Sequence, residues 1–268
     1  MKVPIKDSKN NEKGKKDLPR QFDEQIRTDL IKRAVLSFMS KKRQPYGTDP
    51  LAGKRASAWI SKRRKDYKTS YGHGISRSPR KILSRSGSQF NWVGAFAPNT
   101  VGGRRAHPPK ANKIWEEKIN SKEKKKALRS ALAATISKEI VRAHGHIVPE
   151  DYPFVISNEF EQMKKAKEVV LALKTLGLTQ ELLRCRQKIV RAGKGKARNR
   201  PYKRKVGLLL VVSEKSSLIN IGKNIPGIDI VSVKTLNAKD LAPGAVPGRL
   251  TLFTENAIDT IEKERMFT

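Results

Sequence analysis

The sequence predicts an α/β fold with a mainly parallel sheet and helices on both faces, Rossmann-like but without a nucleotide site, plus a long extended basic loop. In the last third of the chain, short apolar runs alternate with helix-like segments, which is typical of right-handed βαβ crossovers. Charge is unevenly spread: residues 206–268 carry seven bases and seven acids, whereas residues 186–205 carry ten bases and no acid. Residues 41–110 carry seventeen bases and two acids and show no sustained helical or strand period. These observations indicate a neutral globular body with basic appendages.

The first elements of the body follow from apolar spacing and capping residues. Residues 28–40 form a helix capped by Thr28 or Asp29, with a buried face of Leu30, Ile31, Ala34, Val35, Phe38 and Met39. A second helix begins at Asn120, which with Glu123 resembles a capping box. Its packing stripe consists of Ala127, Leu128, Ala131, Leu132 and Thr135. A short strand over residues 154–157 and two helices, over residues 161–176 and 180–188, come next.

The last third of the chain gives the clearest pattern. Residues 207–213 form a continuous apolar strand, as expected where helices cover both faces of a parallel sheet. The elements that follow are a short helix over 216–223, strands over 229–233 and 249–253, and a helical turn over 237–241. Thr254 caps a final helix.

Composition excludes several classes of protein. The chain has 268 residues and a formal net charge of +33, which favours a nucleic acid or another anionic surface as partner. The longest apolar run, residues 206–212, is far shorter than the ~20 residues needed to span a membrane. The basic N-terminus is not followed by an apolar stretch, so no signal peptide is expected. Cys185 is the one cysteine, which excludes internal disulfides, favours a reducing intracellular setting and predicts a small packing residue.

No motif favours catalysis or a bound cofactor. No G-x-G-x-x-G joins a strand to a helix, and the glycines of residues 192–196 lack P-loop spacing and precede their strand. His144 and His146 can chelate weakly, but the nearest acids complete no familiar ligand spacing, so ordinary polar roles are expected. We therefore predict no enzyme activity, no metal site and no cofactor, with any Mg²⁺ belonging to bound RNA.

The two basic segments are suited to RNA in different ways. Residues 41–110 contain spaced aromatic side chains, which disordered tails usually lack, so this segment is expected to become ordered against RNA with bases to stack on. The alternative for these aromatics is packing on the body. Residues 191–200 interleave glycine with cations, which lets the backbone approach phosphates closely. The alternative for this segment is a solvated charge run or a nuclear-import patch.

Several segments of the chain carry a family resemblance. They read DPLAGKR at 49–55, GGRRAHPPK at 102–110, RAGKGK at 191–196, NIPG at 224–227 and LAPGAVPGRL at 241–250, followed by Thr254 and Glu255. In this order and spacing the chain resembles the L-four family of large-subunit ribosomal proteins over nearly its whole length. The archaeal form is favoured because the chain stops soon after its last predicted helix.

The resemblance implies a fold, a function and a set of partners. Residues 1–42 and 111–268 would form a globular α/β body, and residues 43–110 a loop that penetrates 23S-type rRNA. The loop tip, near residues 69–77, would line part of the nascent-peptide exit tunnel. The chain would then be a structural constituent of the large subunit in the cytoplasmic ribosome and would support its assembly. Its partners would be rRNA, neighbouring large-subunit proteins and the nascent peptide, with no membrane.

Three groups of residues are predicted to form the RNA and tunnel surfaces. The phosphate-binding cations are Arg43, Lys54, Arg55, Arg63, Arg64, Lys65, Arg80, Lys81, Arg85, Arg104, Arg105, Lys110, Arg191, Lys194, Lys196, Arg198 and Arg200. The aromatics that would stack on bases are Trp59, Tyr67, Tyr71 and Trp92. The tunnel tip would consist of Gly72, His73, Gly74, Ile75, Ser76 and Arg77. Two other functions stay open: an RNA-processing enzyme with the arm as substrate clamp, and a non-ribosomal RNA chaperone or messenger-binding regulator.

Overall fold

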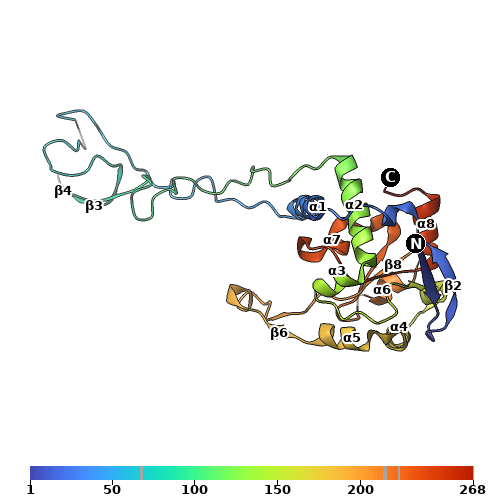
Figure 1. The fold of residues 1–268 in the computed structure, drawn as a ribbon. Helices are drawn as coiled ribbons and strands as arrows, with labels where there is room; N and C mark the ends of the chain where they lie inside the picture. Colours follow the sequence, from blue (N-terminus) through green and yellow to red (C-terminus); the bar gives the residue numbers. More distant parts are fainter. Residues whose placement is uncertain (67–68, 88, 214–215, 223, 268) are drawn as a thin grey trace. The chain divides into compact units, whose positions relative to one another are not determined.

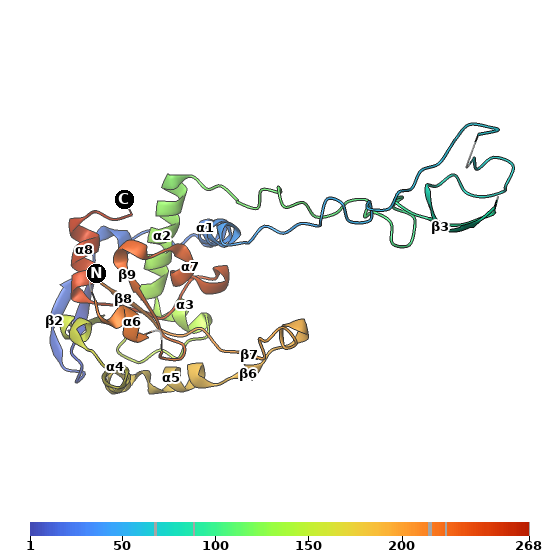
Figure 2. The same ribbon diagram turned by 180° about the vertical axis from the view of Figure 1, so that it is seen from behind.

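The computed structural model describes residues 1–66, 69–87, 89–213, 216–222 and 224–267 and divides the chain into two compact units. The body consists of Met1–Lys42 and Glu116–Thr268, and the arm is Arg43–Trp115. The arm thus continues beyond the predicted boundary at Lys110 and includes Trp115. Figures 1 and 2 show the elements of each unit from opposite sides.

Two small sheets form the centre of the body. Its main strands are β1 Lys2–Lys6, β2 Glu12–Asp17, β5 Val155–Ile156, β8 Leu209–Val212, β9 Asp229–Ser232 and β10 Thr251–Phe253. One sheet has the order β10-β8-β9 with all strands parallel, and the other has the order β2-β1-β5. In the second sheet β1 pairs antiparallel with β2 and parallel with β5. A parallel bridge between Ile156 and Thr254 connects the two sheets.

Helices lie on both sides of β8 in the body (Figures 1 and 2). They are α1 Thr28–Lys41, α2 Ser121–Ile136, α3 Lys138–Ala143, α4 Ala166–Leu173, α5 Thr179–Arg186, α6 Leu218–Gly222, α7 Ala238–Leu241 and α8 Glu255–Lys263. Short 3-10 turns cover Arg20–Phe22, Asn158–Gln162, Gly193–Gly195, Val233–Thr235 and Pro243–Ala245, and a π-helical segment covers Lys174–Leu178.

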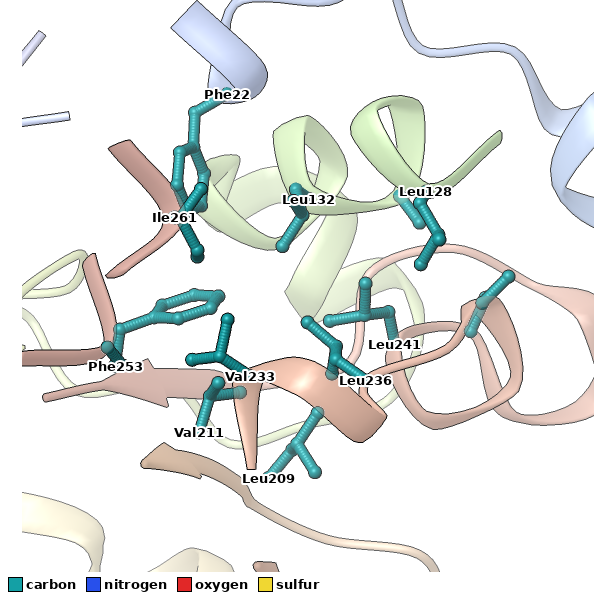
Figure 3. Close-up of a cluster of buried hydrophobic side chains, with 14 of the residues drawn as sticks. Phe22, Leu128, Leu132, Leu209, Val211, Val233, Leu236, Leu241, Phe253 and Ile261 are labelled. Atoms are coloured by element: carbon teal, nitrogen blue, oxygen red, sulfur yellow. The ribbon is translucent and has the colours of Figure 1, made fainter. Parts of the chain in front are cut away.

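Alternate residues of β8 enter two separate apolar cores. Leu209 and Val211 pack with side chains of α2 and α8, including Leu132 and Ile261 (Figure 3). The second core contains Leu210 and Val212 of the strand and Leu208, which directly precedes it, together with side chains from α4 and α6. Each fully buried leucine contributes about 1.5–3 kcal/mol, so the strand is held strongly from both faces. The Rossmann-like classification of the whole body stays a prediction.

The predicted first helix is confirmed, but its start and buried face differ. The N-cap position is Arg27, whose guanidinium bonds Asp29 at 2.6 Å, and neither Thr28 nor Asp29 caps the helix. Met39 is 48% exposed, whereas Ser37 is buried and donates to the Glu117 carbonyl at 2.6 Å. In α2 the predicted packing stripe is buried, although the Asn120 side chain makes no capping bond. In these two helices, the spacing of apolar residues therefore predicts the buried face better than the presence of a capping residue type predicts the N-cap.

The helix predicted over residues 161–176 begins late, at Ala166. Glu161 instead lies in the 3-10 turn, where its carboxylate accepts from the Ser213 amide at 2.9 Å and from Thr254 Oγ1 at 2.6 Å. The cap predicted at Thr254 is confirmed, because its hydroxyl accepts from the Ala257 amide at 3.3 Å. The local sequence could not predict the position of Glu161, because its carboxylate is bound by Ser213 and Thr254, which are distant in sequence.

Candidate nucleic-acid interface

The arm contains an antiparallel hairpin of β3 Arg80–Ser86 and β4 Gln89–Gly94. Along β4, Phe90 and Trp92 are half-buried and alternate with exposed residues. The Arg85 guanidinium lies 5.2 Å from the Phe90 ring, and that of Arg80 lies 5.7 Å from the Trp92 ring. These cation–π contacts place two of the predicted phosphate-binding cations against aromatic rings of the same hairpin.

The base of the arm is closed by a stack of aromatic and cationic side chains, the aromatic clasp of Arg43, Tyr46, Lys113 and Trp115. The Tyr46 and Trp115 rings stack at 5.3 Å with an interplanar angle of 22°. The Arg43 guanidinium lies 4.0 Å from the Trp115 ring and Lys113 Nζ lies 4.4 Å from it. Arg43, predicted to bind phosphate, is thus positioned by Trp115, which sequence reasoning missed. The sequence did contain a signal for this contact, because an aromatic residue with a cation nearby lies near each end of the basic segment, Tyr46 near one end and Trp115 near the other.

Further along, the two limbs of the arm approach at positions that require glycine. Gly53 has φ +73°, and a Cβ there would lie 2.5 Å from the Gly103 carbonyl. A Cβ on Gly47 would lie 2.5 Å from the Ala111 amide nitrogen. Between these points the Thr48 amide donates to the Pro109 carbonyl at 3.0 Å. The two motifs at 49–55 and 102–110 therefore lie against each other.

The predicted tip is held by short-range hydrogen bonds. Ser61 Oγ donates to Asp66 at 2.6 Å, Thr69 Oγ1 donates to the Arg63 carbonyl at 2.7 Å, and Ser61 and Thr69 form a parallel bridge. Gly72 and Gly74 have φ of +81° and +65°, with open space where a Cβ would stand. Both are conformations that glycine adopts at little cost.

The tip side chains surround one aromatic ring. Tyr71 is half-buried, with the Arg77 guanidinium 4.6 Å from its ring and that of Arg64 5.8 Å from it. His73 is exposed, Ile75 is half-buried, and Ser76 Oγ accepts from Arg80 at 3.2 Å. Trp59 is 46% exposed, and Tyr67 lies outside the described residues. The structure thus brings Tyr71 and Arg77 together.

The remaining predicted cations of the arm are mostly exposed. Arg104 is half-buried. Those with exposed side chains are Lys54, Arg55, Arg63, Arg64, Lys65, Lys81, Arg85, Arg105 and Lys110.

A second candidate surface, the basic hairpin over residues 186–205, belongs to the body. Its strands are β6 Ile189–Val190 and β7 Tyr202–Lys203, paired antiparallel. Arg191 turns back onto the hairpin: its amide donates to the Pro201 carbonyl at 2.7 Å and its Nη2 donates to the Tyr202 carbonyl at 3.3 Å. Arg191 therefore shapes the turn, while Lys194, Lys196, Arg198 and Arg200 are exposed around it.

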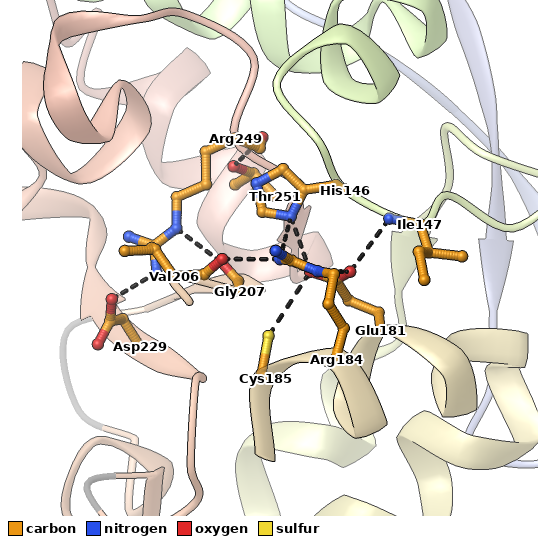
Figure 4. A network of polar contacts seen from close by, with 10 residues as sticks. All are labelled: His146, Ile147, Glu181, Arg184, Cys185, Val206, Gly207, Asp229, Arg249 and Thr251. Atoms are coloured by element: carbon orange, nitrogen blue, oxygen red, sulfur yellow. Dashed lines mark hydrogen bonds and ion pairs between the residues drawn. The ribbon is translucent and has the colours of Figure 1, made fainter. Parts of the chain in front are cut away.

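A buried network at the root of the basic hairpin, the root network, is centred on Glu181 (Figure 4). The Glu181 carboxylate is paired with His146 Nδ1 at 2.7 Å and accepts from the Ile147 amide at 3.1 Å and from Arg184 Nε at 2.7 Å. Burial acts to raise the pKa of Glu181, but the bonds from His146, Arg184 and Ile147 outweigh it and lower the pKa to about 2. The carboxylate is therefore ionised at neutral pH.

The root network also holds the chain where it leaves the hairpin. Arg184 Nη2 donates to the Val206 carbonyl at 2.7 Å, and Arg249 Nε donates to the Gly207 carbonyl at 2.8 Å (Figure 4). A Cβ on Gly207 would lie 2.4 Å from Cys185 Sγ, so these segments are in close contact. Cys185 is 2% exposed, and burial raises its pKa to about 11, as fits the predicted packing role.

In the described part of the chain, neither a grouped set of metal ligands nor an apolar helix of membrane-spanning length occurs. Within those residues, no three His, Cys, Asp or Glu side chains are grouped so as to hold a metal ion. His144 and His146 stack on each other at 5.2 Å between ring centroids. Of the helices described, none has the length and apolarity to cross a membrane.

Comparison with known proteins gives one consistent result. The model of the ribosomal protein L4/L1 family matches residues 17–264. The chain is 48% identical to the large ribosomal subunit protein uL4 of Nanoarchaeum equitans, over 100% of both chains. It is 42% identical to the protein of the same name from Archaeoglobus fulgidus, over 97% of both chains, and 44% identical to that of Methanococcoides burtonii, over 96% of both.

Proposed function

The chain belongs to the ribosomal protein L4/L1 family, and from this premise we propose that it binds large-subunit rRNA through its arm and its basic hairpin. Family membership makes it a structural protein of the archaeal large ribosomal subunit, located in the cytoplasmic ribosome, and not an enzyme. The sequence predicted this family and this class of function. The RNA-processing alternative is thereby excluded, and no observation favours a non-ribosomal chaperone.

The observation that carries the proposal concerns the acids of the arm. Asp49 and Asp66 are the two acidic residues between Arg43 and Trp115. Asp49 accepts from the Leu51 amide at 2.9 Å and pairs with Arg55, while Asp66 accepts from Ser61. Because both carboxylates are engaged within the arm, the exposed cations present an almost unopposed positive surface to RNA.

Salt dependence of RNA binding tests the contribution of the basic hairpin. The full chain would be titrated with a large-subunit rRNA fragment at several salt concentrations. Replacing Lys194 and Lys196 with glutamine should reduce the slope of log K against log salt by about 1.4–1.8, since each of the two phosphate contacts contributes roughly 0.7–0.9. The matched control replaces the exposed body residues Lys164 and Lys167 with glutamine. An equal effect in both double variants would contradict the assignment to the basic hairpin.

We also propose that the arm tip lines the nascent-peptide exit tunnel, while the arm fills an RNA cavity during assembly beside neighbouring large-subunit proteins. The support is the open, glycine-flanked position of His73. A photo-crosslinking residue at position 73, in ribosomes carrying the full chain, should capture the nascent peptide. The control position is His107, also exposed but on the returning limb. Equal capture at both positions, or none at 73, would contradict the tip assignment.

A further inference from the structure

A cavity of about 640 Å³ lies within the arm, between its two limbs. One wall is the tight turn around Asp49, in which the Ala52 amide donates to the Asp49 carbonyl at 2.9 Å. The close approaches at Gly47 and Gly53 lie at its two ends, so the separation of the limbs is constrained at both. The cavity, called here the neck pocket, is therefore built by the backbone. Its volume suits one small ligand or nucleotide.

The walls of the neck pocket combine cations with flat apolar surfaces. The cations are Lys54, Arg104, Arg105 and Lys110. The one acid, Asp49, already pairs with Arg55 and the Leu51 amide. Three prolines, Pro50, Pro108 and Pro109, supply rigid apolar faces. Thr48 and Asn112 add side chains able to donate and accept hydrogen bonds.

This combination fits a nucleotide better than other anions. A phosphate alone would use the cations and leave the proline faces without a partner. A nucleotide uses both, because its phosphate binds Arg and Lys while its base lies against an apolar surface. A base in a continuous duplex cannot enter a pocket of this size, so the occupant must be unpaired.

We propose that the neck pocket binds a single unpaired nucleotide extruded from the RNA. The base lies against Pro108 and Pro109, and Arg104 and Arg105 bind its phosphate. This inference rests on the proposed RNA binding and adds a defined subsite to it. The prediction from sequence treated these cations only as separate phosphate contacts.

The test compares two RNA hairpins that differ by one bulged nucleotide. The full chain should bind the bulged hairpin at least about fivefold more tightly than the fully paired one, the lower end of what one base contact contributes. Ala52→Phe fills the pocket without changing charge and should abolish this preference while leaving affinity for the paired hairpin unchanged. The control is Ala58→Phe, the same change in the arm at a residue that does not line the pocket.

A second pair of variants keeps the test valid if Ala52→Phe disturbs the turn. Arg105→Gln should lower the bulged-to-paired affinity ratio, whereas Lys81→Gln, also exposed, should weaken both hairpins equally. If the wild-type protein binds both hairpins with equal affinity, the proposal that the neck pocket binds a nucleotide is wrong, whereas the proposal that the chain binds RNA is unaffected. Failure to bind either hairpin would contradict the proposed function itself. If an acidic peptide displaces RNA from the wild-type protein but not from Ala52→Phe, the pocket binds a protein partner and not a nucleotide.

Discussion

Replacing Glu181 with glutamine should destabilise the body by about 3–5 kcal/mol at neutral pH. The carboxylate is 1% exposed and pairs with Arg184, whose side chain is 14% exposed. Lowering of the Glu181 pKa from its ordinary 4.5 to about 2 corresponds to about 3 kcal/mol. Removing the charge also leaves the Arg184 guanidinium buried without its counter-charge, which raises the cost toward the upper end.

Urea unfolding followed by far-UV circular dichroism measures this loss. Tryptophan fluorescence is unsuitable because all three tryptophans, Trp59, Trp92 and Trp115, belong to the arm. The control is Glu168→Gln, which removes an exposed ion pair with Lys165 at 3.9 Å and should cost less than about 1 kcal/mol. A loss below about 1 kcal/mol for Glu181→Gln would refute the view that the root network stabilises the body.

The pH dependence of this difference has a defined sign. Because folding lowers the pKa of Glu181, its stabilisation is fully present above pH 4.5 and is lost as pH falls from 4.5 toward about 2. The difference in unfolding free energy between wild type and Glu181→Gln should therefore narrow over that range. A difference that stays constant from pH 7 to pH 3 would mean that the carboxylate is not the stabilising group.

Three further outcomes follow from the arm. The Lys54 amide donates to the Leu51 carbonyl at 2.8 Å, and Gly53→Ala should speed its exchange because a Cβ at position 53 would collide with the Gly103 carbonyl and disturb this turn. Gly72→Ala has the same sign of φ but open space around it and should leave that amide unaffected. Trp115→Leu removes the aromatic clasp and should speed exchange of the Thr48 amide, and unchanged exchange would count against the clasp. Deleting residues 58–82 should leave the urea midpoint of the body within error of wild type, and an unfolded body would disprove the division into two units.

Apolar periodicity predicted the body well where strands and helices are strongly apolar. The stripe of α2 and the strand around Leu210 were found because burial there depends on side-chain spacing alone. The β1–β2 hairpin was missed because lysines dominate it, although Val3 and Ile5 alternate into the core. The late start of α4 was missed because Glu161 is bound by residues distant in sequence.

The candidate nucleic-acid interface was likewise predicted in part. Charge and aromatic content located the basic segments, but contacts between limbs decided individual roles. Arg43 lies on Trp115 and Arg191 on its own turn, which spacing could not reveal. The neck pocket arises from two motifs more than forty residues apart that meet only in the folded arm.

Co-sedimentation with large ribosomal subunits in high salt tests the central claim most directly. Contacts made by surface charges alone weaken steeply with salt, whereas an arm inserted into RNA should stay bound. The full chain should therefore remain with the subunit after a high-salt wash, and the variant lacking residues 58–82 should be released. Release of the full chain, or equal retention of both proteins, would contradict binding through the arm.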